Sequence, residues 1–354
     1  MKKKLQNKSP GPDEVLNSFL KRSPENLLTD LLHLFNFSWC SGLVPDAWKL
    51  GVISPILKPD RDPKLVESYR PICMLSTIGK LMEHIINKRI EHYLETNSKL
   101  KPSQYGFRHG KSTTDALLVL KNEIVHSLEK RHTCIVVHLD IAGAFDCVWH
   151  VGLLYKLLKL GVDWQTVNWI KNYLTNRRMV VRLGSTSSAS KQVSCGVPQG
   201  AVLSPILFNI MLHDLPDDEF VKNIIYADDV TLTVSGCDIA STAQKMQRYL
   251  NLLSQWFHKW HFTLNPSKCS SQIFTRTRRV PHISLLLNQV PIPTTAKKRV
   301  LGVIFDAPNL TFNAHIKCLK DVLKRKTNIM KSLSSSQSVE SVRYLEDSLR
   351  TILN

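Results

Sequence analysis

Near the middle of the chain the sequence reads Asn223-Ile224-Ile225-Tyr226-Ala227-Asp228-Asp229-Val230-Thr231-Leu232-Thr233-Val234. After the acidic pair, apolar residues alternate with threonines at period 2, and the run before the pair is mostly apolar. The stretch therefore predicts a β-hairpin with Asp228 and Asp229 at its tip. Burying an unpaired charge is costly, so two adjacent carboxylates between buried strands favour a bound cation. By itself the pattern is equally typical of an ordinary acidic turn.

A third carboxylate follows a second predicted strand. The mostly apolar run that begins at Thr133 ends in Asp140, and its length predicts a buried strand with the acid at its C-terminal end. Mg²⁺ prefers one or two protein carboxylates and completes its shell with water and substrate phosphate. Asp140 and Asp228 on neighbouring strands would suit two such ions about 3.5–4 Å apart. The alternative is that Asp140 only caps its strand.

A glycine-bearing loop lies between these acids in the sequence, Gly196-Val197-Pro198-Gln199-Gly200-Ala201-Val202-Leu203-Ser204-Pro205. Ser204 is predicted to be the N-cap, and Pro205 the first residue, of a helix that runs to Met211. Such a loop lets a flat substrate approach the backbone closely, although it could equally be a packing turn.

Two further helices are predicted from apolar spacing. Asp238 would cap a long helix whose apolar stripe includes Met246 and Leu250. The spacing of Val151, Leu154 and Leu158 predicts a second helix, which would end near Gly161.

Together these motifs resemble the reverse transcriptase domain of non-LTR retrotransposons, most closely the jockey-like elements. The resemblance covers roughly residues 8–305, and Glu14 and Ala201 depart from it where glycine and serine are usual. Other stretches match the family in the same order: Ser9–Asp13, Trp48–Lys58, Tyr69–Ile72, Gln104–Thr113, Asn265–Cys269 and Val300–Val303. The resemblance implies an α+β, right-hand polymerase fold with fingers and palm and a partial basic helical thumb.

The resemblance also implies a division of the chain into three parts. Residues 1–50 would form an N-terminal extension, 51–275 the fingers and palm, and 276–354 a basic, truncated thumb-like region. Full elements of this family usually carry an N-terminal endonuclease, so the chain is expected to be a fragment of a longer or decayed copy.

The charge distribution points to a polyanionic partner. The chain carries a net charge of +18, and residues 276–331 hold 12 Lys or Arg against 2 Asp or Glu. An excess of this kind suits phosphate contacts and counterion release, although solvated basic faces are common. Lys297, Lys298 and Arg299 are the predicted nucleic-acid-binding residues.

Roles for individual residues follow from the resemblance. Asp140, Asp228 and Asp229 would be catalytic, and Asp140, Asp228 and the Ile141 carbonyl would hold two Mg²⁺ ions, with Mn²⁺ as a substitute. Asp146 would anchor its turn through hydrogen bonds. The residues expected to bind the dNTP are Lys58 and Arg70 at the triphosphate, Phe145 beneath the sugar, Gln199 at the sugar or its 3′-hydroxyl, and Lys268 as the acid that protonates pyrophosphate.

The implied function is RNA-directed DNA polymerisation on an RNA template with a DNA primer and dNTPs. The alternatives are an inactive reverse transcriptase fold that binds nucleic acid, and an intron- or retron-type polymerase of the same fold. The eight cysteines show no zinc-ligand spacing, and the basic N-terminus is not followed by an apolar signal core. We therefore expect a protein of the nucleus or cytoplasm with reduced thiols, without zinc, a membrane span or a secretory signal.

Overall fold

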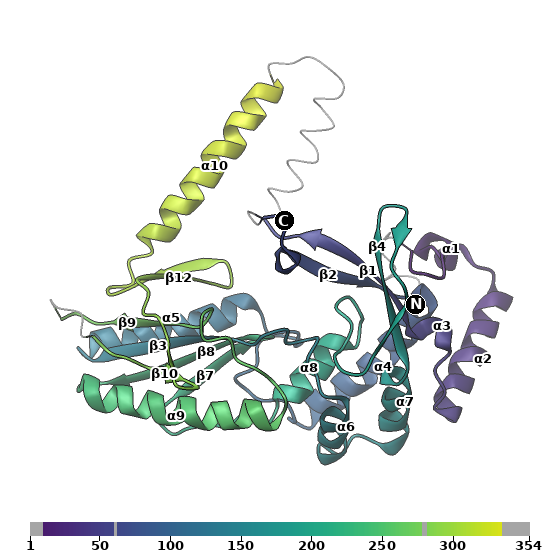
Figure 1. Cartoon of the computed structure of the whole chain (residues 1–354), viewed down its shortest axis with the longest axis horizontal. Coiled ribbons are helices and arrows are strands. Elements are labelled where there is room, and N and C mark those ends of the chain that lie inside the picture. The colour runs from purple at the N-terminus through teal and green to yellow at the C-terminus, as the bar shows by residue number, and fades with distance from the viewer. Residues whose placement is uncertain (1–9, 60–61, 278–281, 335–354) are drawn as a thin grey trace.

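Two β-sheets organise the chain in the computed structural model, which describes residues 10–59, 62–277 and 282–334 (Figure 1). The first sheet has the strand order β7-β8-β3-β9 and is antiparallel throughout. Its strands are β3 (Thr133–Asp140), β7 (Lys222–Tyr226), β8 (Asp229–Gly236) and β9 (Ser270–Phe274). The strand predicted to end at Asp140 and the predicted hairpin are both confirmed.

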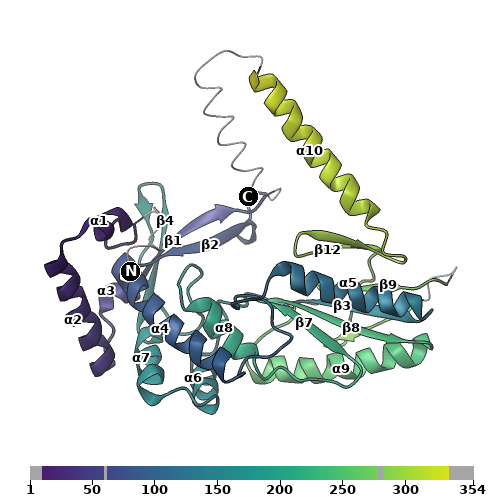
Figure 2. The ribbon, with the colours of Figure 1, turned by 180° about the vertical axis from the view of Figure 1, so that it is seen from behind.

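Helices cover both faces of this sheet, α5 (Thr113–Glu129) on one and α9 (Ile239–Lys259) on the other (Figures 1 and 2). Leu232 of β8 joins the core on the α9 side, and the threonines on the opposite face of that strand, Thr231 and Thr233, are buried as well. A sheet covered on both faces buries apolar and polar strand positions alike, so the threonines do not face water.

The predicted start of α9 is confirmed at atomic detail. The Asp238 carboxylate accepts hydrogen bonds from the N–H groups of Ala240 (3.4 Å) and Ser241 (2.7 Å). The stripe that follows is buried against the sheet, with Met246 and Leu250 fully enclosed. The cap therefore fixes where the covering helix begins, and the stripe fixes which side it turns to the strands.

The second sheet has the order β2-β1-β4-β5, with β6 also paired to β4. Strands β1 and β4 are parallel, and the other pairs are antiparallel. The strands are β1 (Leu50–Leu57), β2 (Tyr69–Met74), β4 (Arg177–Leu183), β5 (Thr186–Ser187) and β6 (Lys191–Val193), and a 3₁₀ turn, η2 (Val66–Ser68), precedes β2.

One group of helices lies at the end of the first sheet and below the second, and another stands at the N-terminal end of the described chain (Figure 1). The first group is α4 (Thr77–Thr96), α6 (His150–Lys159), α7 (Trp164–Leu174) and α8 (Ser204–Leu212). The second is α1 (Asn17–Arg22), α2 (Glu25–Ser41) and α3 (Asp46–Lys49). The Trp169 indole of α7 donates to Ser38 of α2 at 3.0 Å, which joins the two groups.

The helix predicted from Val151, Leu154 and Leu158 is confirmed as α6 and ends just before Gly161, but its buried side differs from the one that this spacing indicates. Val151 and Leu158 are 64% and 47% exposed, whereas the neighbouring positions Leu153 and Leu157 are fully buried. The reason is Lys156, which is also fully buried: its ammonium donates to the Met211 carbonyl and pairs with Asp214, and it lies 3.7 Å from the Trp260 ring centroid. Burial lowers the pKa of Lys156 to about 8.

The C-terminal part begins with two small hairpins and ends in a helix that projects away from the sheets (Figures 1 and 2). The elements are β10 (Leu286–Leu287), β11 (Val290–Pro291), β12 (Lys297–Val300), β13 (Val303–Asp306) and α10 (Asn313–Ser334). Ser9 of the N-terminal motif, Arg278 and Arg279, and the predicted thumb-like region beyond 334 lie outside the described residues. Within the described ranges no helix is both long and apolar enough to cross a bilayer.

The N-terminal motif has a packing explanation. Asp13 accepts hydrogen bonds from the Ser76 hydroxyl (2.7 Å) and the Ile78 N–H (3.2 Å), so it braces the start of α4. Glu14, which stands where the resembled family has glycine, has a φ of +53°. That left-handed conformation favours glycine, which accounts for the usual residue at this position.

We expect Asp238→Ala to lower the free energy of unfolding by about 1 kcal/mol, because two N–H groups at the start of α9 lose their acceptor. Asp238→Asn, which keeps an oxygen acceptor, should remain close to wild type. Urea denaturation of the three proteins measures both effects. Equal losses in the two variants would contradict the assigned cap.

Candidate active site

Strand pairing brings three carboxylates together. Asp140, the last residue of β3, pairs directly with Asp229, the first residue of β8. Tyr226 pairs with Asp229 across the hairpin, so Ala227 and Asp228 form the turn between them. The predicted tip is thus correct for Asp228, whereas Asp229 already belongs to the strand.

The backbone around Asp140 is fixed by the segment that precedes β9. The Asn265 N–H donates to the Asp140 carbonyl (3.0 Å), and the Ala142 N–H donates to the Thr263 carbonyl (2.9 Å). These bonds flank a bridge between Ile141 and Leu264, so the Ile141 carbonyl points away from its bridge partner. The segment that precedes β9 therefore does not use this carbonyl.

The three carboxylates repel one another. Burial, the charge of Asp228 and the charge of Asp140, in that order of size, together raise the pKa of Asp229 to about 6, while Lys298 opposes them. Burial also raises the pKa of Asp228, and the Asp140 charge adds to the increase. Asp228 and Asp229 nevertheless remain solvent-accessible. An incoming cation would relieve this repulsion.

The donor set suits a hard dication. Among the described residues, no three His, Cys, Asp or Glu side chains are grouped so that they could hold a metal by themselves. An ion here would instead take one or two carboxylates, a main-chain carbonyl and oxygens from water or substrate, which is the pattern of Mg²⁺. Asp140, Asp228 and the main chain at Ile141 carry oxygens of these kinds.

Three cations reach the same site from other elements. A small cavity of about 60 Å³ is lined by Asp140 and Asp229 together with Lys268, Lys298 and Arg299. Lys297 does not line it: its side chain is exposed, and its register partner is Asp306. From the sequence, Lys297, Lys298 and Arg299 were predicted to act as one basic stretch. In the structure only Lys298 and Arg299 lie beside Asp140 and Asp229.

Arg299 also joins this cavity to the projecting helix. Its guanidinium donates to the Gly302 carbonyl at the tip of the β12–β13 hairpin and to the Cys318 sulfur of α10, both at 3.3 Å. The orientation of α10 is therefore coupled to the wall of the carboxylate site.

The Gln199 loop docks onto the second sheet. The Cys73 N–H donates to the Gln199 carbonyl at 2.7 Å. Gly200 has a φ of +117°, and a Cβ there would lie 2.7 Å from the Cys73 carbonyl oxygen, so only glycine fits this close approach. The Gln199 side-chain amide donates to both Asp146 oxygens, at 3.3 and 3.1 Å. Asp146 thus makes hydrogen bonds at its turn, as the sequence predicted.

The predicted cap of α8 is wrong. The helix begins at Ser204 itself, and the Ser204 hydroxyl donates to the Pro198 carbonyl (2.8 Å) instead of accepting from the helix. Glu83 of α4, which is 2% exposed, accepts from the N–H groups of Val202 (2.7 Å) and Leu203 (3.2 Å) in its place. Sequence reasoning missed Glu83, although a charged residue beside Met82 and Ile86 on the buried stripe of α4 was a usable signal.

Phe145 is both packed and accessible. Its ring stacks on Phe208 with centroids 4.8 Å apart, and it meets the ring of Phe107 edge-on at 6.4 Å. It is half-buried. The ring therefore rests on the core with one part open to solvent, beside the Gly143 turn that follows Asp140.

Lys58 and Arg70 lie apart from the carboxylates. Both belong to the β1–β2 hairpin region of the second sheet, and neither lines the cavity beside Asp140 (Figure 1). The Lys58 ammonium donates to the Glu67 carbonyl at 2.8 Å, and Arg70 is exposed. A ligand that touches these residues and Asp140 together would have to span the space between the two sheets.

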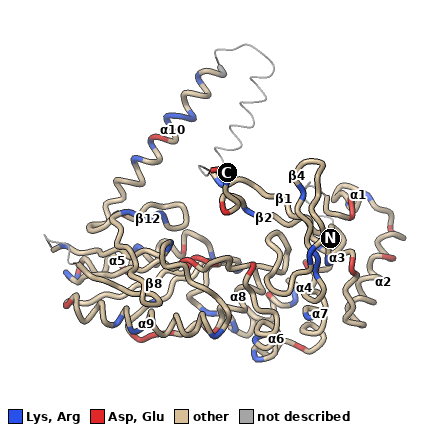
Figure 3. Tube along the Cα trace, viewed as in Figure 1, with Lys and Arg blue, Asp and Glu red and all other residues tan. Residues whose placement is uncertain are grey.

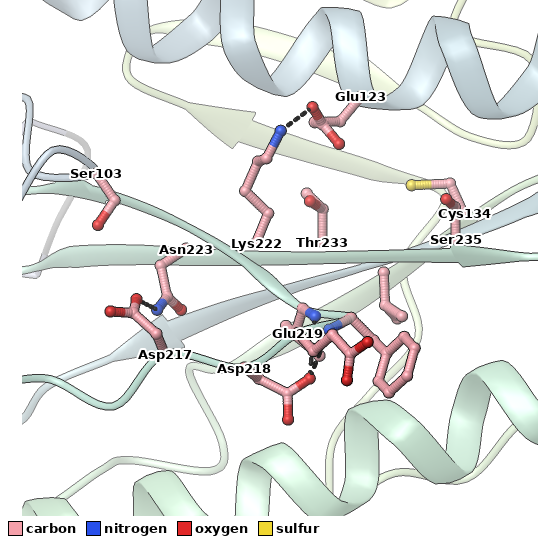
Figure 4. Close-up of a pocket in the computed structure, with 13 residues that line it drawn as sticks. Ser103, Glu123, Cys134, Asp217, Asp218, Glu219, Lys222, Asn223, Thr233 and Ser235 are labelled. Atoms are coloured by element: carbon pink, nitrogen blue, oxygen red, sulfur yellow. Dashed lines mark hydrogen bonds and ion pairs between the residues drawn. The ribbon is translucent and has the colours of Figure 1, made fainter.

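A larger cavity of about 450 Å³ lies elsewhere, beside β7 (Figure 4). Acidic residues gather there, but Lys222 pairs with Glu123 in its wall, and Asp218 pairs with Arg248. It contains none of the predicted site residues, so cavity size alone does not locate the candidate site.

Comparison with known proteins identifies related sequences. Residues 56–305 match the family described as reverse transcriptase (RNA-dependent DNA polymerase). The chain is 34% identical over 337 residues to a probable RNA-directed DNA polymerase from transposon X-element of Drosophila melanogaster, with 94% of this chain and 37% of that protein covered. It is 32% identical over 340 residues to the RNA-directed DNA polymerase from mobile element jockey of Drosophila funebris, with the same two coverages. The chain thus spans little more than a third of these relatives, and the jockey-like resemblance is confirmed.

Solved structures show the same fold at low sequence identity. Apo telomerase from Candida tropicalis superposes with a TM-score of 0.52 at 12% identity, covering 81% of this chain and 53% of that one. A form of this telomerase truncated from the C-terminal domain gives 0.50, covering 80% and 59%. The α+β, right-hand polymerase fold expected from the sequence is confirmed.

Without a divalent metal, we expect Asp229→Asn to raise the free energy of unfolding at pH 8 by about 1 kcal/mol. The substitution removes a partly desolvated charge and its repulsion by Asp228 and Asp140, and solvent screening keeps the gain small. Folded Asp229 binds its proton more tightly than unfolded Asp229, so its contribution to wild-type stability should fall as pH rises from the ordinary value of 3.8 to about 6.

Urea denaturation in EDTA at pH 4 and pH 8 measures this difference, with Asp30→Asn on the exposed face of α2 as the control. The gain should be present at pH 8 and small at pH 4. A destabilised Asp229→Asn protein at pH 8 would refute the repulsion.

Proposed function

This chain belongs to the reverse transcriptase (RNA-dependent DNA polymerase) family, and from that premise we propose that it catalyses RNA-templated synthesis of DNA from a primer and dNTPs. Because the chain spans only part of its relatives, the substrates and partners of the whole protein are part of the proposal. The observation that carries it is the direct pairing of Asp140 with Asp229, with Asp228 on the adjoining turn.

Asp140 and Asp228 would bind two Mg²⁺ ions with the help of the Ile141 carbonyl, and Mn²⁺ could replace them. When bound, Mg²⁺ supplies charge neutralisation to the attacking primer oxygen and to the leaving pyrophosphate. Asp229 faces Asp140 across the strand pair and adds to the negative potential that draws cations to this site. The carboxylate repulsion that contributes to the raised pKa values of Asp228 and Asp229 would also favour a bound cation.

The nucleotide would be held from both sheets. Lys58 and Arg70 would bind the triphosphate from the fingers, where the planar Arg fork suits phosphate. Lys268 would protonate the leaving pyrophosphate from beside Asp140. The Gln199 side chain donates to Asp146 through Nε2. Its Oε1 atom is therefore the part of the side-chain amide that can accept a hydrogen bond from a sugar hydroxyl.

Basic residues would hold the RNA template and DNA primer. Lys and Arg recur along β12 and α10 (Figure 3). Lys298 and Arg299 would bind the primer end beside the carboxylates, and Lys297 would contact phosphate further out. We propose the same three parts as the sequence suggests: residues 1–50, the fingers and palm at 51–275, and the thumb-like 276–354. We also propose that the protein acts in the nucleus or cytoplasm and that it requires neither zinc nor a membrane.

We expect Asp140→Asn and Asp228→Asn each to reduce primer extension on an RNA template with dNTPs and Mg²⁺ by at least about a thousandfold, since an essential ligand loses its charge. The control is Asp30→Asn, which should extend primers like wild type. Folding is checked by circular dichroism. Normal extension by a folded Asp140→Asn protein would refute the metal-binding role. Template binding without synthesis by wild type would instead favour an inactive, nucleic-acid-binding fold.

We expect Phe145→Val to keep most dNTP incorporation but to raise rNTP incorporation by tenfold or more, because the ring would no longer collide with a ribose 2′-hydroxyl. Removing a clash of about 1.4 kcal/mol corresponds to tenfold in rate. Single-nucleotide incorporation with dNTP and rNTP pairs measures the ratio.

Phe107→Leu, which trims the ring that touches the edge of Phe145, is the control and should leave sugar selectivity unchanged. If Phe145→Val loses dNTP and rNTP use equally, Phe145 is a packing residue only.

A further inference from the structure

The segment before α5 lies along the free edge of the catalytic hairpin. The Ile225 N–H of β7 donates to the Ser103 carbonyl (2.9 Å), and the Tyr105 N–H donates to the Ile225 carbonyl (2.7 Å). Gln104 is thus placed opposite Ile225 as a parallel bridge partner. Figure 4 shows Ser103 on the chain that runs beside β7. We call residues 101–108 the hairpin brace.

Gln104 joins this brace to the turn that carries Asp228. Its side chain is 2% exposed, and its Oε1 atom accepts from the Gly106 N–H (2.9 Å) and the Ala227 N–H (3.3 Å). Ala227 has a φ of +55°, a left-handed conformation that alanine adopts at a cost. A buried acceptor aimed at its N–H group stabilises that conformation, and Asp228 is the next residue.

The backbone of Gly106 packs tightly against Ala227, the residue that Gln104 contacts. A Cβ atom at this position would lie 2.3 Å from the Ala227 nitrogen. Its carbonyl accepts from the Asn209 amide of α8 at 2.9 Å, and Asn209 is itself buried. The turn therefore packs directly on the backbone of the brace, which is fixed in turn to α8.

Ion pairs anchor both ends of the brace away from the turn. Arg108 binds Glu95 of α4 through two nitrogens and donates to the Lys101 carbonyl at 2.7 Å. Lys101, which is buried, donates to the Leu215 carbonyl and pairs with Asp217. With both ends held by other elements, the position of Gln104 does not depend on the turn that it contacts.

We propose that Gln104 is a positioning residue, which sets the orientation of the Asp228 carboxylate through the Ala227 N–H. The effect on catalysis of a misplaced Asp228 carboxylate rests on the proposed function, whereas the contact between Gln104 and Ala227 does not. A loose turn would move one of the two proposed metal-binding carboxylates relative to Asp140. Small displacements at a reacting centre can cost about a hundredfold in rate.

The test compares Gln104→Leu, which removes the acceptor at similar size, with Gln104→Glu, which keeps an oxygen that can accept the same N–H. Ile124→Val, a fully buried change in α5 on the same sheet, is the control for a general loss of stability. Hydrogen exchange of the peptide that contains Ala227 reports on the turn without requiring activity. Binding of Mn²⁺ followed by electron paramagnetic resonance, together with kcat and KM for dNTP, reports on its consequence.

For Gln104→Leu we expect faster exchange at the turn, at least about tenfold weaker Mn²⁺ binding and about tenfold to a hundredfold lower kcat, with KM for dNTP within about twofold. Gln104→Glu should restore part of each loss. Ile124→Val should change the melting temperature but none of these readouts.

Unchanged exchange and Mn²⁺ binding in folded Gln104→Leu would overturn the proposal, as would a rise in KM at constant kcat. If Gln104→Leu does not fold, Gln104→Met carries the same test, since its sulfur is only a weak acceptor. If wild type binds Mn²⁺ but makes no DNA, the proposed function fails while the exchange and Mn²⁺ results still decide the role of Gln104.

Discussion

Repulsion among Asp140, Asp228 and Asp229 is the constraint on which the rest of this structure depends. Cross-strand pairing places Asp140 opposite Asp229, and one turn residue then brings Asp228 to the same end of the sheet. No described side chain neutralises the group fully, since Lys298 opposes only part of the effect on Asp229. The molecule keeps the acids together by fixing the backbone on every side: helices α5 and α9 cover the sheet, the segment before β9 holds Asp140, and the hairpin brace holds Ala227. A site that is electrostatically unfavourable when empty is well prepared for cations.

The same arrangement explains how distant parts of the chain converge. The Gln199 loop touches β2 through Cys73 and the turn after β3 through Asp146, so it joins the second sheet to the segment that follows Asp140. Arg299 does the equivalent on the other side, where it lines the carboxylate cavity and binds the sulfur of Cys318 on α10. Both the second sheet and α10 therefore make direct contacts with residues close to the acids.

Much of the fold could be predicted from local patterns, because the elements that carry the acids follow strong periodicity. The strand that ends at Asp140, the hairpin around Asp228 and the helix capped by Asp238 all appear as the sequence indicates. The errors arose where a long-range contact replaced a local one. Ser204 does not cap α8, because buried Glu83 reaches its N-terminus from another helix. The buried face of α6 was displaced because Lys156 is buried among aromatic rings, where spacing rules treat lysine as a surface residue.

The candidate site was predictable as a set of residues but not as a geometry. Motif order named the acids, whereas only the structure separates Lys297 from Lys298 and Arg299 and shows what Gln104 touches. The most direct measurement is a crystal structure with template, primer, a non-hydrolysable dNTP and Mn²⁺, using anomalous scattering to locate the metal. We expect two anomalous peaks bound by Asp140, the Ile141 carbonyl and Asp228, within reach of the nucleotide phosphates. An occupied nucleotide site without metal at these carboxylates, or metal bound at other residues, would contradict it.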